Sequence, residues 1–397
     1  MRITQGMEQS QFLTAISQLE SSIAQTQQQI SSGDAFSTAS QDPVAAGQVA
    51  NYNQVLVQTQ QYTANGTSAQ SSLNTEDSAL TQIQSVLQSL RDLALEANNG
   101  ASSPQNLAAL ATQAEQIQQT LLSLANTQDG SGNYIFAGYD TETAPFALTA
   151  TGATYSGDQG QRQVQIGPDQ TVVVGDNGDL VFNQIKTGNG GFTVTAGASN
   201  TGSGLIGASS VTDPATYMPG DYTIDFTSPT AYQVLNAAHA VVASGNYTAG
   251  QAIAFDGLQV TLSGQPATGD TFAVAPSTNQ SMFTTVQNLI DTLTHGASGP
   301  NGQVALSNSI SSAIENIDEA LTQTQNVQAS VGARLNTITT QQSVATAQQT
   351  QLQQNISNLQ SLDYASAITT LDQQNTTLSA ALQAYSLTQG LSLFKYL

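Results

Sequence analysis

The chain has 397 residues, only 8% of them charged, and 27 acidic residues against six basic ones give a formal net charge of −21. So large a negative excess repels a phosphate backbone, so the composition argues against a nucleic-acid-binding protein. The absence of cysteine excludes disulfides and thiolate metal sites, and it suits a chain that enters an oxidising space. No apolar run of about 18 residues predicts membrane insertion, and the first residues lack the apolar stretch of a cleaved secretory signal.

The first amphipathic segment begins near Phe12. Its apolar residues recur in the alternating steps of a heptad seam, with Thr26 in the one polar slot. These apolar residues are Phe12, Ile16, Leu19, Ile23 and Ile30. Gly33 predicts the end of this helix, because glycine adopts the left-handed conformation that follows a helix. Helical spacing resumes after Asp42-Pro43, since proline is tolerated in a first helical turn.

Two more helical seams precede residue 133. One ends at Asn98-Asn99-Gly100, and the other begins after Pro104. The first contains Ile83, Leu87, Leu90, Ala94 and Ala97; the second contains Leu107, Leu110, Ala114, Ile117, Leu121 and Leu124.

From about Asn133 the apolar period becomes two, which predicts strands. The expected strands are 134–136, 172–174, 180–182, 222–226, 253–255 and 258–262. Residues 175–179 have the composition of a hairpin turn between two of these strands. The Gly/Ser/Thr-rich stretch 187–211 is expected to be a long loop.

Helical spacing returns near Phe283, stops near His295-Gly296 and continues in a long helix through Ile338. The last segment has a seam in which Asn375 takes one slot. Its apolar members are Leu352, Ile356, Leu359, Leu371, Leu378, Leu382 and Tyr385. The step of 12 residues from Leu359 to Leu371 breaks the heptads, so a register shift is expected.

The order of helices, strands and helices predicts an α+β fold. Long terminal α-helices would form a coiled-coil or helical-bundle rod, with a central β-rich inserted domain. The expected inner helical domain combines 1–45 with 346–397, and the helical rod domain combines 46–137 with 281–345. Residues 138–280 would form the β-rich outer inserted domain.

The apolar stripes of the two chain ends need a partner, and the simplest partner of each is the other. The residues expected to carry this packing and assembly are Phe12, Ile16, Leu19, Ile23, Ile30, Leu371, Leu378, Leu382 and Tyr385. The remaining faces carry Gln, Asn, Ser, Thr and Ala, which can pack against like faces without the desolvation cost of charges. A polymer of identical helices would use such faces, although a lone coiled coil also explains the pattern.

Residues suited to catalysis or metal binding are few. His239 and His295 cannot make a three-histidine site, and both are interpreted as cap or surface residues. Neither a phosphate-binding G-x-x-x-x-G-K-[ST] loop nor a G-x-S-x-G elbow occurs. The cluster 176–179 lacks the spacing and the final Glu of a Ca²⁺ loop, which favours a tight turn. We therefore expect no enzymatic activity, no cofactor and no metal.

Short motifs in a fixed order resemble those of the flagellin superfamily. They are Met1-Arg2-Ile3-Thr4, Ile30-Ser31-Ser32-Gly33, residues 40–46, residues 132–138, Ala144-Pro145-Phe146, residues 155–158, residues 269–272, residues 331–336 and the apolar tail 391–397. Asp42, Pro43 and Val44 favour the hook-associated protein 3 family over filament flagellins, and Gly332 and Arg334 belong to the same pattern. Gln41 departs from the acidic residue common at that place, and residues 159–252 match poorly.

The resemblance implies a structural component of the bacterial flagellum that joins the hook to the flagellin filament. It implies as partners the first hook-associated protein, flagellin, further copies in a ring-like assembly, the distal filament cap, and a cytoplasmic export chaperone at the C-terminal segment. It also implies type III export without a cleaved signal and an extracellular location at the hook–filament junction. Two alternatives stay open: a filament flagellin, and a secreted adhesin that uses the β-rich insert.

Overall fold

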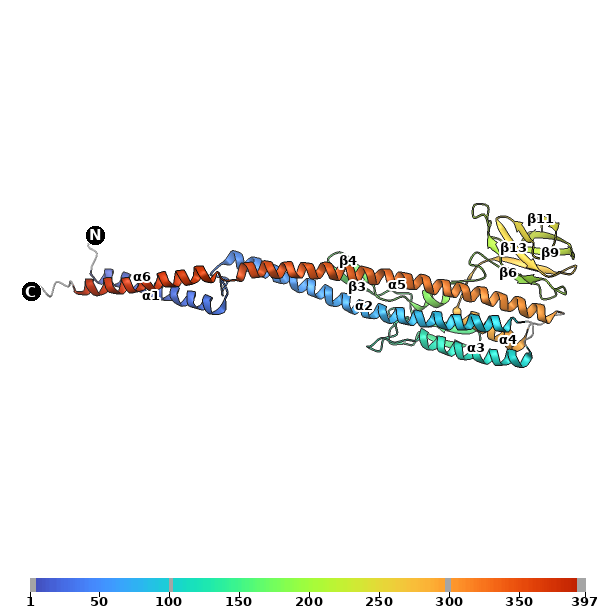
Figure 1. Cartoon of the computed structure of the whole chain (residues 1–397), viewed down its shortest axis with the longest axis horizontal. Coiled ribbons are helices and arrows are strands. Elements are labelled where there is room, and N and C mark those ends of the chain that lie inside the picture. Colours follow the sequence, from blue (N-terminus) through green and yellow to red (C-terminus); the bar gives the residue numbers. More distant parts are fainter. Residues whose placement is uncertain (1–4, 100–102, 297–300, 391–397) are drawn as a thin grey trace, which may run out of the picture. The chain divides into compact units, whose positions relative to one another are not determined.

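The computed structural model describes residues 5–99, 103–296 and 301–390 (Figure 1). The sequence motifs at 1–4 and 391–397 lie outside the described residues. The chain forms two compact units, one from residues 1–64 with 341–397 and the other from residues 65–340. Within the described part of the chain, no helix is both long enough and apolar enough to cross a membrane.

Long helices dominate both ends of the chain, which confirms the predicted α+β class. The helices of the described residues are α1 (Gln5–Ser32), α2 (Pro43–Ala97), α3 (Pro104–Ala125), α4 (Met282–His295), α5 (Gly302–Gln360) and α6 (Tyr364–Gly390). α1 and α6 pack side by side in the first unit (Figure 1), as do α3 and α4 in the second.

Local chemistry sets the helix ends where the sequence predicts them. Gly33 ends α1 with a φ of 80°, and its N–H donates to the Gln29 carbonyl over 2.8 Å. The Asp42 carboxylate caps α2 by accepting from the N–H groups of Val44 and Ala45 at 3.1 and 2.9 Å. Ser103 caps α3 through the N–H of Asn106, and Pro43 and Pro104 each open the helix that follows.

Between α5 and α6 the chain leaves the helix at residues 361–363, where the sequence predicted only a register shift. The Asp363 carboxylate caps α6, which starts a new helix there. The same break is joined to the end of α1, because the Leu362 N–H donates to the Gly33 carbonyl and the Ala35 N–H to the Gln360 carbonyl. These two hydrogen bonds therefore hold the C-terminal end of α1 beside the N-terminal end of α6.

The strands form several small sheets. Two-stranded pairs join β1 (Phe146–Thr149) to β2 (Gly152–Tyr155), β3 (Gln163–Gly167) to β4 (Gln170–Val173), and β5 (Ile185–Lys186) to β15 (Asn279–Gln280). A five-stranded antiparallel sheet has the order β11 (Val241–Asn246), β10 (Ala231–Asn236), β9 (Tyr222–Ser228), β14 (Thr271–Pro276) and β6 (Phe192–Ala196). A further sheet contains β12 (Ala252–Phe255), β13 (Leu258–Ser263), β7 (Leu205–Ile206) and β8 (Ser210–Val211).

The predicted strands at 222–226, 253–255 and 258–262 are confirmed, and three other predictions in this region are wrong. Residues 187–211 are not one long loop, because they contain β6, β7 and β8. Residues 179–183 form a π-helical turn in place of the second strand of a hairpin. The Asn177 side chain accepts from the Leu180 N–H there, and the Asp179 carboxylate accepts from Asn183. β4 pairs with β3 instead.

Residues 134–136 form a turn with one isolated bridge rather than a strand. Burial of the Ile135 and Phe136 side chains stabilises this turn. Gly138, which follows, adopts a φ of 75°. The Asp158 carboxylate accepts from the N–H groups of Tyr139 and Asp140, so it closes this loop.

The second unit contains two hydrophobic cores. One combines α2, α3, α4 and α5 with residues 135–185, and its aromatic centre is made by Phe136, Phe146, Phe182 and Phe283. The buried residues of the other all lie between Phe192 and Val274, and all of them except Tyr247 are in strands. The segment expected to form one outer domain over 138–280 is thus divided, because its first part shares the core of the helices.

Candidate functional site: the paired terminal helices and the joints of the rod

The antiparallel pair of α1 and α6 is held at one end by two aromatic rings. The rings of Phe12 and Tyr385 stack with centroids 4.9 Å apart and an interplanar angle of 6°. The Gln9 amide donates to the Tyr385 hydroxyl over 3.0 Å. Such ring pairs contribute about 0.5–1.5 kcal/mol beyond the area that they bury.

A polar pair fixes the register further along the same two helices. Thr26 is 7% exposed, and its hydroxyl lies 3.0 Å from the Ser22 carbonyl and 3.2 Å from the Gln374 side-chain oxygen. A polar residue at one position of an apolar seam specifies register, and a shift of α6 along α1 would break the contact between Thr26 and Gln374. Thr26, the one polar residue in the predicted heptad seam of α1, is therefore matched by Gln374 on α6.

Most of the predicted packing residues lie between α1 and α6. Ile23 is buried; the half-buried members are Phe12, Ile16, Leu19, Ile30, Leu371, Leu378 and Tyr385. Leu382 differs, because 49% of its surface is exposed and Ala381 takes the covered position. The covered residues of α6 follow the spacing Leu371, Gln374, Leu378, Ala381 and Tyr385. Asn375 is exposed as well, so Gln374 supplies the polar slot that the sequence assigned to its neighbour.

An apolar face of α6 stays uncovered in the single chain. Tyr364, Ile368 and Leu382 are each about half exposed, and steps of four and fourteen residues keep them on one side of a helix. Leu387 is 70% exposed, and Leu13 on α1 is 51% exposed. Apolar groups left in water in this number are typical of a surface that other proteins cover.

Two residues of the family motif, Pro43 and Val44 at the start of α2, are exposed. The third, Asp42, caps this helix. Gly332 lies on α5, where an added Cβ would meet no atom within 4 Å. Packing within one chain therefore does not require glycine there.

Arg334 has a defined partner, because it forms an ion pair with Asp176, and only 15% and 3% of the two side chains are exposed. The backbone N–H of Asp176 donates to the Glu76 carboxyl over 3.1 Å. Burial first, and the adjacent Asp176 charge second, raise the pKa of Glu76 to about 8. The cluster joins α2, the turn after β4 and α5, and nothing in the local sequence signals it.

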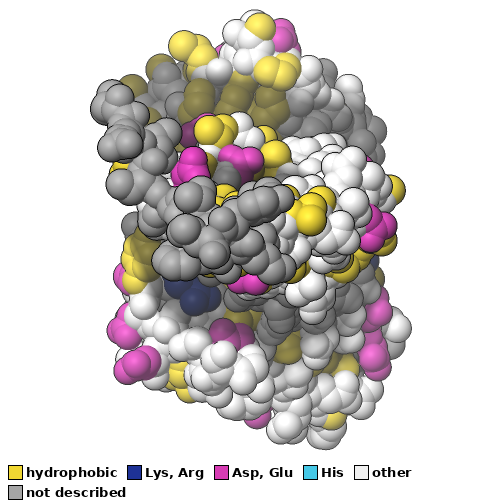
Figure 2. All heavy atoms as spheres, turned by 90° about the vertical axis from the view of Figure 1, so that its left-hand side faces the viewer, with side chains coloured by type: hydrophobic (Ala, Val, Ile, Leu, Met, Phe, Trp, Pro, Cys, Tyr) yellow, Lys and Arg dark blue, Asp and Glu magenta, His cyan; other side chains and the backbone are white. Residues whose placement is uncertain are grey.

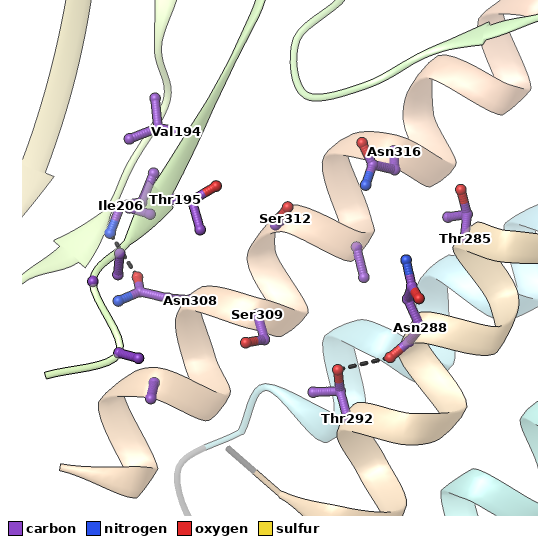
Figure 3. Close-up of a pocket in the computed structure, with 15 residues that line it drawn as sticks. Val194, Thr195, Ile206, Thr285, Asn288, Thr292, Asn308, Ser309, Ser312 and Asn316 are labelled. Atoms are coloured by element: carbon purple, nitrogen blue, oxygen red, sulfur yellow. Dashed lines mark hydrogen bonds between the residues drawn. The ribbon is translucent and has the colours of Figure 1, made fainter. Parts of the chain in front are cut away.

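Three asparagines, Asn301 just before α5 and Asn308 and Asn316 on it, tie the outer strand domain to the rod. Sequence reasoning missed them. Asn301 donates to the Gly202 carbonyl, and Asn316 accepts from the Gly188 N–H. Asn308 donates to the Gly204 carbonyl over 3.1 Å. It also accepts from the Ile206 N–H over 2.8 Å (Figure 3). The step of eight residues from Asn308 to Asn316 keeps these two on one side of α5, and this spacing is the signal that could have found them.

A cavity of about 380 Å³ lies beside the last two of these asparagines, between β6, α4 and α5 (Figure 3). Its lining is uncharged and includes Thr195, Asn288, Thr292, Ser309 and Ser312. No Asp, Glu, His, Lys or Arg is among the described residues that line this cavity.

Charge is sparse on the surface as well. The face in Figure 2 has scattered acidic side chains among uncharged ones and few basic ones. His239 is exposed in a turn, and His295 is exposed at the end of α4, where its ring nitrogen lies 3.1 Å from the Asp291 carbonyl. In the described ranges no group of three or more His, Asp or Glu residues could hold a metal ion.

Comparison with known families finds flagellar components in three parts of the chain. The bacterial flagellin N-terminal helical region matches residues 3–141, and the bacterial flagellin C-terminal helical region matches residues 314–397. The D2-like domain of flagellar hook-associated protein 1 matches residues 195–276, which is the range of the outer strand core.

Among curated proteins, flagellar hook-associated protein 3 of Salmonella typhimurium is 35% identical over 187 residues, which cover 47% of this chain and 58% of that protein. The match thus spans little more than half of the relative. The crystal structure of Xanthomonas campestris FlgL is 30% identical with a TM-score of 0.71, and the match covers 77% of this chain and 99% of that one. The flagellar junction protein FlgL of Legionella pneumophila is 30% identical with a TM-score of 0.72, and the match covers 79% and 100%.

Proposed function

The chain belongs to the flagellar hook-associated protein 3 family, and we propose that it is a structural component of the flagellum that joins the hook to the filament. The observation that carries the proposal is the pairing of α1 with α6, which leaves an apolar face of α6 uncovered. A subunit of an assembly needs both features: a defined unit and a surface for its neighbours.

The proposed partners are the first hook-associated protein on the hook side, flagellin on the filament side, and further copies in a ring-like assembly. The distal cap would act during assembly. A chaperone at the C-terminal segment would cover the exposed side of α6, where Tyr364, Ile368 and Leu382 lie. Export without a cleaved signal and an extracellular location complete the proposal. Flagellin-type helical regions at both chain ends support this set of partners.

We propose no catalytic role. The residues with assigned roles are those of the terminal helix pair, with Asp42 as the cap of α2 and Arg334 as a partner of Asp176.

The experiment is deletion of the gene, followed by electron microscopy of the cells and analysis of the medium. We expect intact hooks, no filaments and flagellin in the medium, with all three reversed by the intact gene on a plasmid. Normal filaments on the deletion strain would refute the junction role. Long filaments formed by the purified protein alone would indicate a filament flagellin instead.

A further inference from the structure

Three residues far apart in the sequence meet in a buried cluster. Glu76 comes from α2, Asp176 from the turn after β4, and Arg334 from α5. Glu76 is 1% exposed and Asp176 is 3% exposed. The Gln161 amide donates to the second Asp176 oxygen over 3.3 Å, and Arg334 also donates to the Ser330 hydroxyl.

The cluster contains two carboxyl groups and one guanidinium, so its charges balance only when one carboxyl holds a proton. Asp176 pairs with Arg334 and is therefore the natural anion. Glu76 lies against the N–H of Asp176 through one oxygen, and its other oxygen is buried without a hydrogen-bond partner among the described residues. The Arg334 Nη1 atom is also buried without a hydrogen-bond partner among the described residues. Ionised Glu76 would thus be an uncompensated buried charge, whereas protonated Glu76 is neutral.

We propose that Glu76, Asp176 and Arg334 form a one-proton latch, which holds the turn after β4 between α2 and α5 while Glu76 is protonated and loosens it in alkaline medium. The latch makes the second unit sensitive to pH through a single buried proton. It is independent of the partners proposed for the terminal helices.

The other charged groups on the surrounding elements have partners elsewhere. Asp77, next on α2, accepts from Gln328. Asp179 on the following turn accepts from Asn183 and Gln184. Arg162, on the segment that pairs with residue 174, acts on Asp129. The charges that act on the Glu76 carboxyl are those of Asp176 and Arg334.

The direction of the pH effect follows from the raised pKa of Glu76, which is about 8 in the folded chain against an ordinary value of 4.5. Between these two values the folded chain holds one proton that the unfolded chain has lost. The stability supplied by the protonated latch is therefore complete below the ordinary pKa, and it falls as pH rises towards the folded pKa. Each pH unit in this window multiplies the unfolding equilibrium constant by up to about ten from this group alone.

The test compares denaturant unfolding of the full chain with that of Glu76→Gln between about pH 5 and pH 9. The amide of Gln keeps the shape and the acceptor for the Asp176 N–H but cannot ionise. We expect the wild-type equilibrium constant to rise with pH relative to the variant by at least about 100-fold across the window. Glu115→Gln, an exposed change on α3, should follow the wild type at every pH.

Two further readouts keep the test decisive if Glu76→Gln folds poorly. Carbon NMR of the wild-type carboxyl groups should show one glutamate that titrates near pH 8. The Asp176 amide should lose protection against hydrogen exchange above about pH 8, and it should do so equally in the wild type and in Glu115→Gln, because both keep Glu76. A Glu76 midpoint below about pH 6, or parallel pH dependence in the wild type and Glu76→Gln, would overturn the latch.

Discussion

The substitution Leu378→Asp tests the side of α6 that packs against α1 independently of the side that is exposed to solvent. Leu378 occupies a covered position between Gln374 and Ala381. The register set by Phe12 with Tyr385 and by Thr26 with Gln374 brings it level with the stretch from Leu19 to Ile23 of α1. Leu378→Asp therefore puts a carboxylate against an apolar stripe.

The magnitude follows from partial burial. Full burial of a leucine contributes about 1.5–3 kcal/mol, so a half-buried one contributes about 1–1.5 kcal/mol. The lower helix propensity of Asp adds about 0.5 kcal/mol. A total loss of about 2 kcal/mol corresponds to roughly 30-fold in the pairing equilibrium of α1 and α6. Leu382→Asp, four residues further along α6, lowers helix propensity by the same amount but removes little buried surface. We therefore expect it to weaken the pairing equilibrium of α1 and α6 only about twofold.

The assay is hydrogen exchange on the α1 amides of the purified monomeric chain, since exchange there reports opening of the helix pair. Leu378→Asp should accelerate exchange around Leu19 and Ile23 by about tenfold or more over Leu382→Asp. In cells, both variants should reduce motility if the open side of α6 contacts neighbouring subunits. Equal acceleration by the two substitutions would refute the register, and normal motility of Leu382→Asp would refute contact through the open side.

Two further predictions concern single contacts. Asn308→Ala leaves the Ile206 N–H and the Gly204 carbonyl unpaired, so we expect a loss of about 1–3 kcal/mol in the docking of the outer strand domain; faster exchange of the Ile206 amide checks it, with the exposed Ser309→Ala as the control. Gly33→Ala forces a side chain into a φ of 80° and sets its Cβ 2.9 Å from the Tyr364 hydroxyl, so thermal unfolding should register a loss of about 1–2 kcal/mol. Gly332→Ala, which meets open space, should cost nothing measurable.

Helix ends were predictable because their causes are local. Gly33, the Asp42-Pro43 pair and Pro104 act within one turn of the chain, so the sequence contains all the information that they need. The face of α6 was predicted less well. Ala381 and Leu382 are both apolar neighbours, and only the pairing with α1 decides which of them is covered.

Contacts between distant segments could not be predicted. Asp176 meets Glu76 across 100 residues and Arg334 across 158 residues. Residues 134–136 and 180–182 are apolar runs, and alternation alone suggested strands. The aromatic centre around Phe136 and Phe182 buries these runs as turns instead, which is a tertiary effect that overrides local propensity.

The two cores of the second unit change which part of the chain can be removed. A short Gly/Ser linker in place of residues 159–252, the stretch that matches the family motifs poorly, would be tolerable only if the whole β-rich segment were one outward insert. That cut would remove Ile166, Val172 and Phe182, which are at most 5% exposed and belong to the core of the helices. Loss of one buried large apolar side chain typically costs about 2–5 kcal/mol, so this variant should not fold.

A cut at residues 189–276 follows the structure instead. The outer core lies wholly between Phe192 and Val274. The remaining ends are already joined, because the Thr187 N–H donates to the Thr278 carbonyl over 3.0 Å and β5 pairs with β15. Closely spaced ends are the condition under which an inserted domain can be removed. We expect this variant, closed by a short Gly/Ser linker, to unfold cooperatively in circular dichroism, and to restore filaments in the deletion strain. If it folds and is exported but builds no filament, the outer strand domain makes essential contacts between subunits, and a polymer built by the helices alone is refuted.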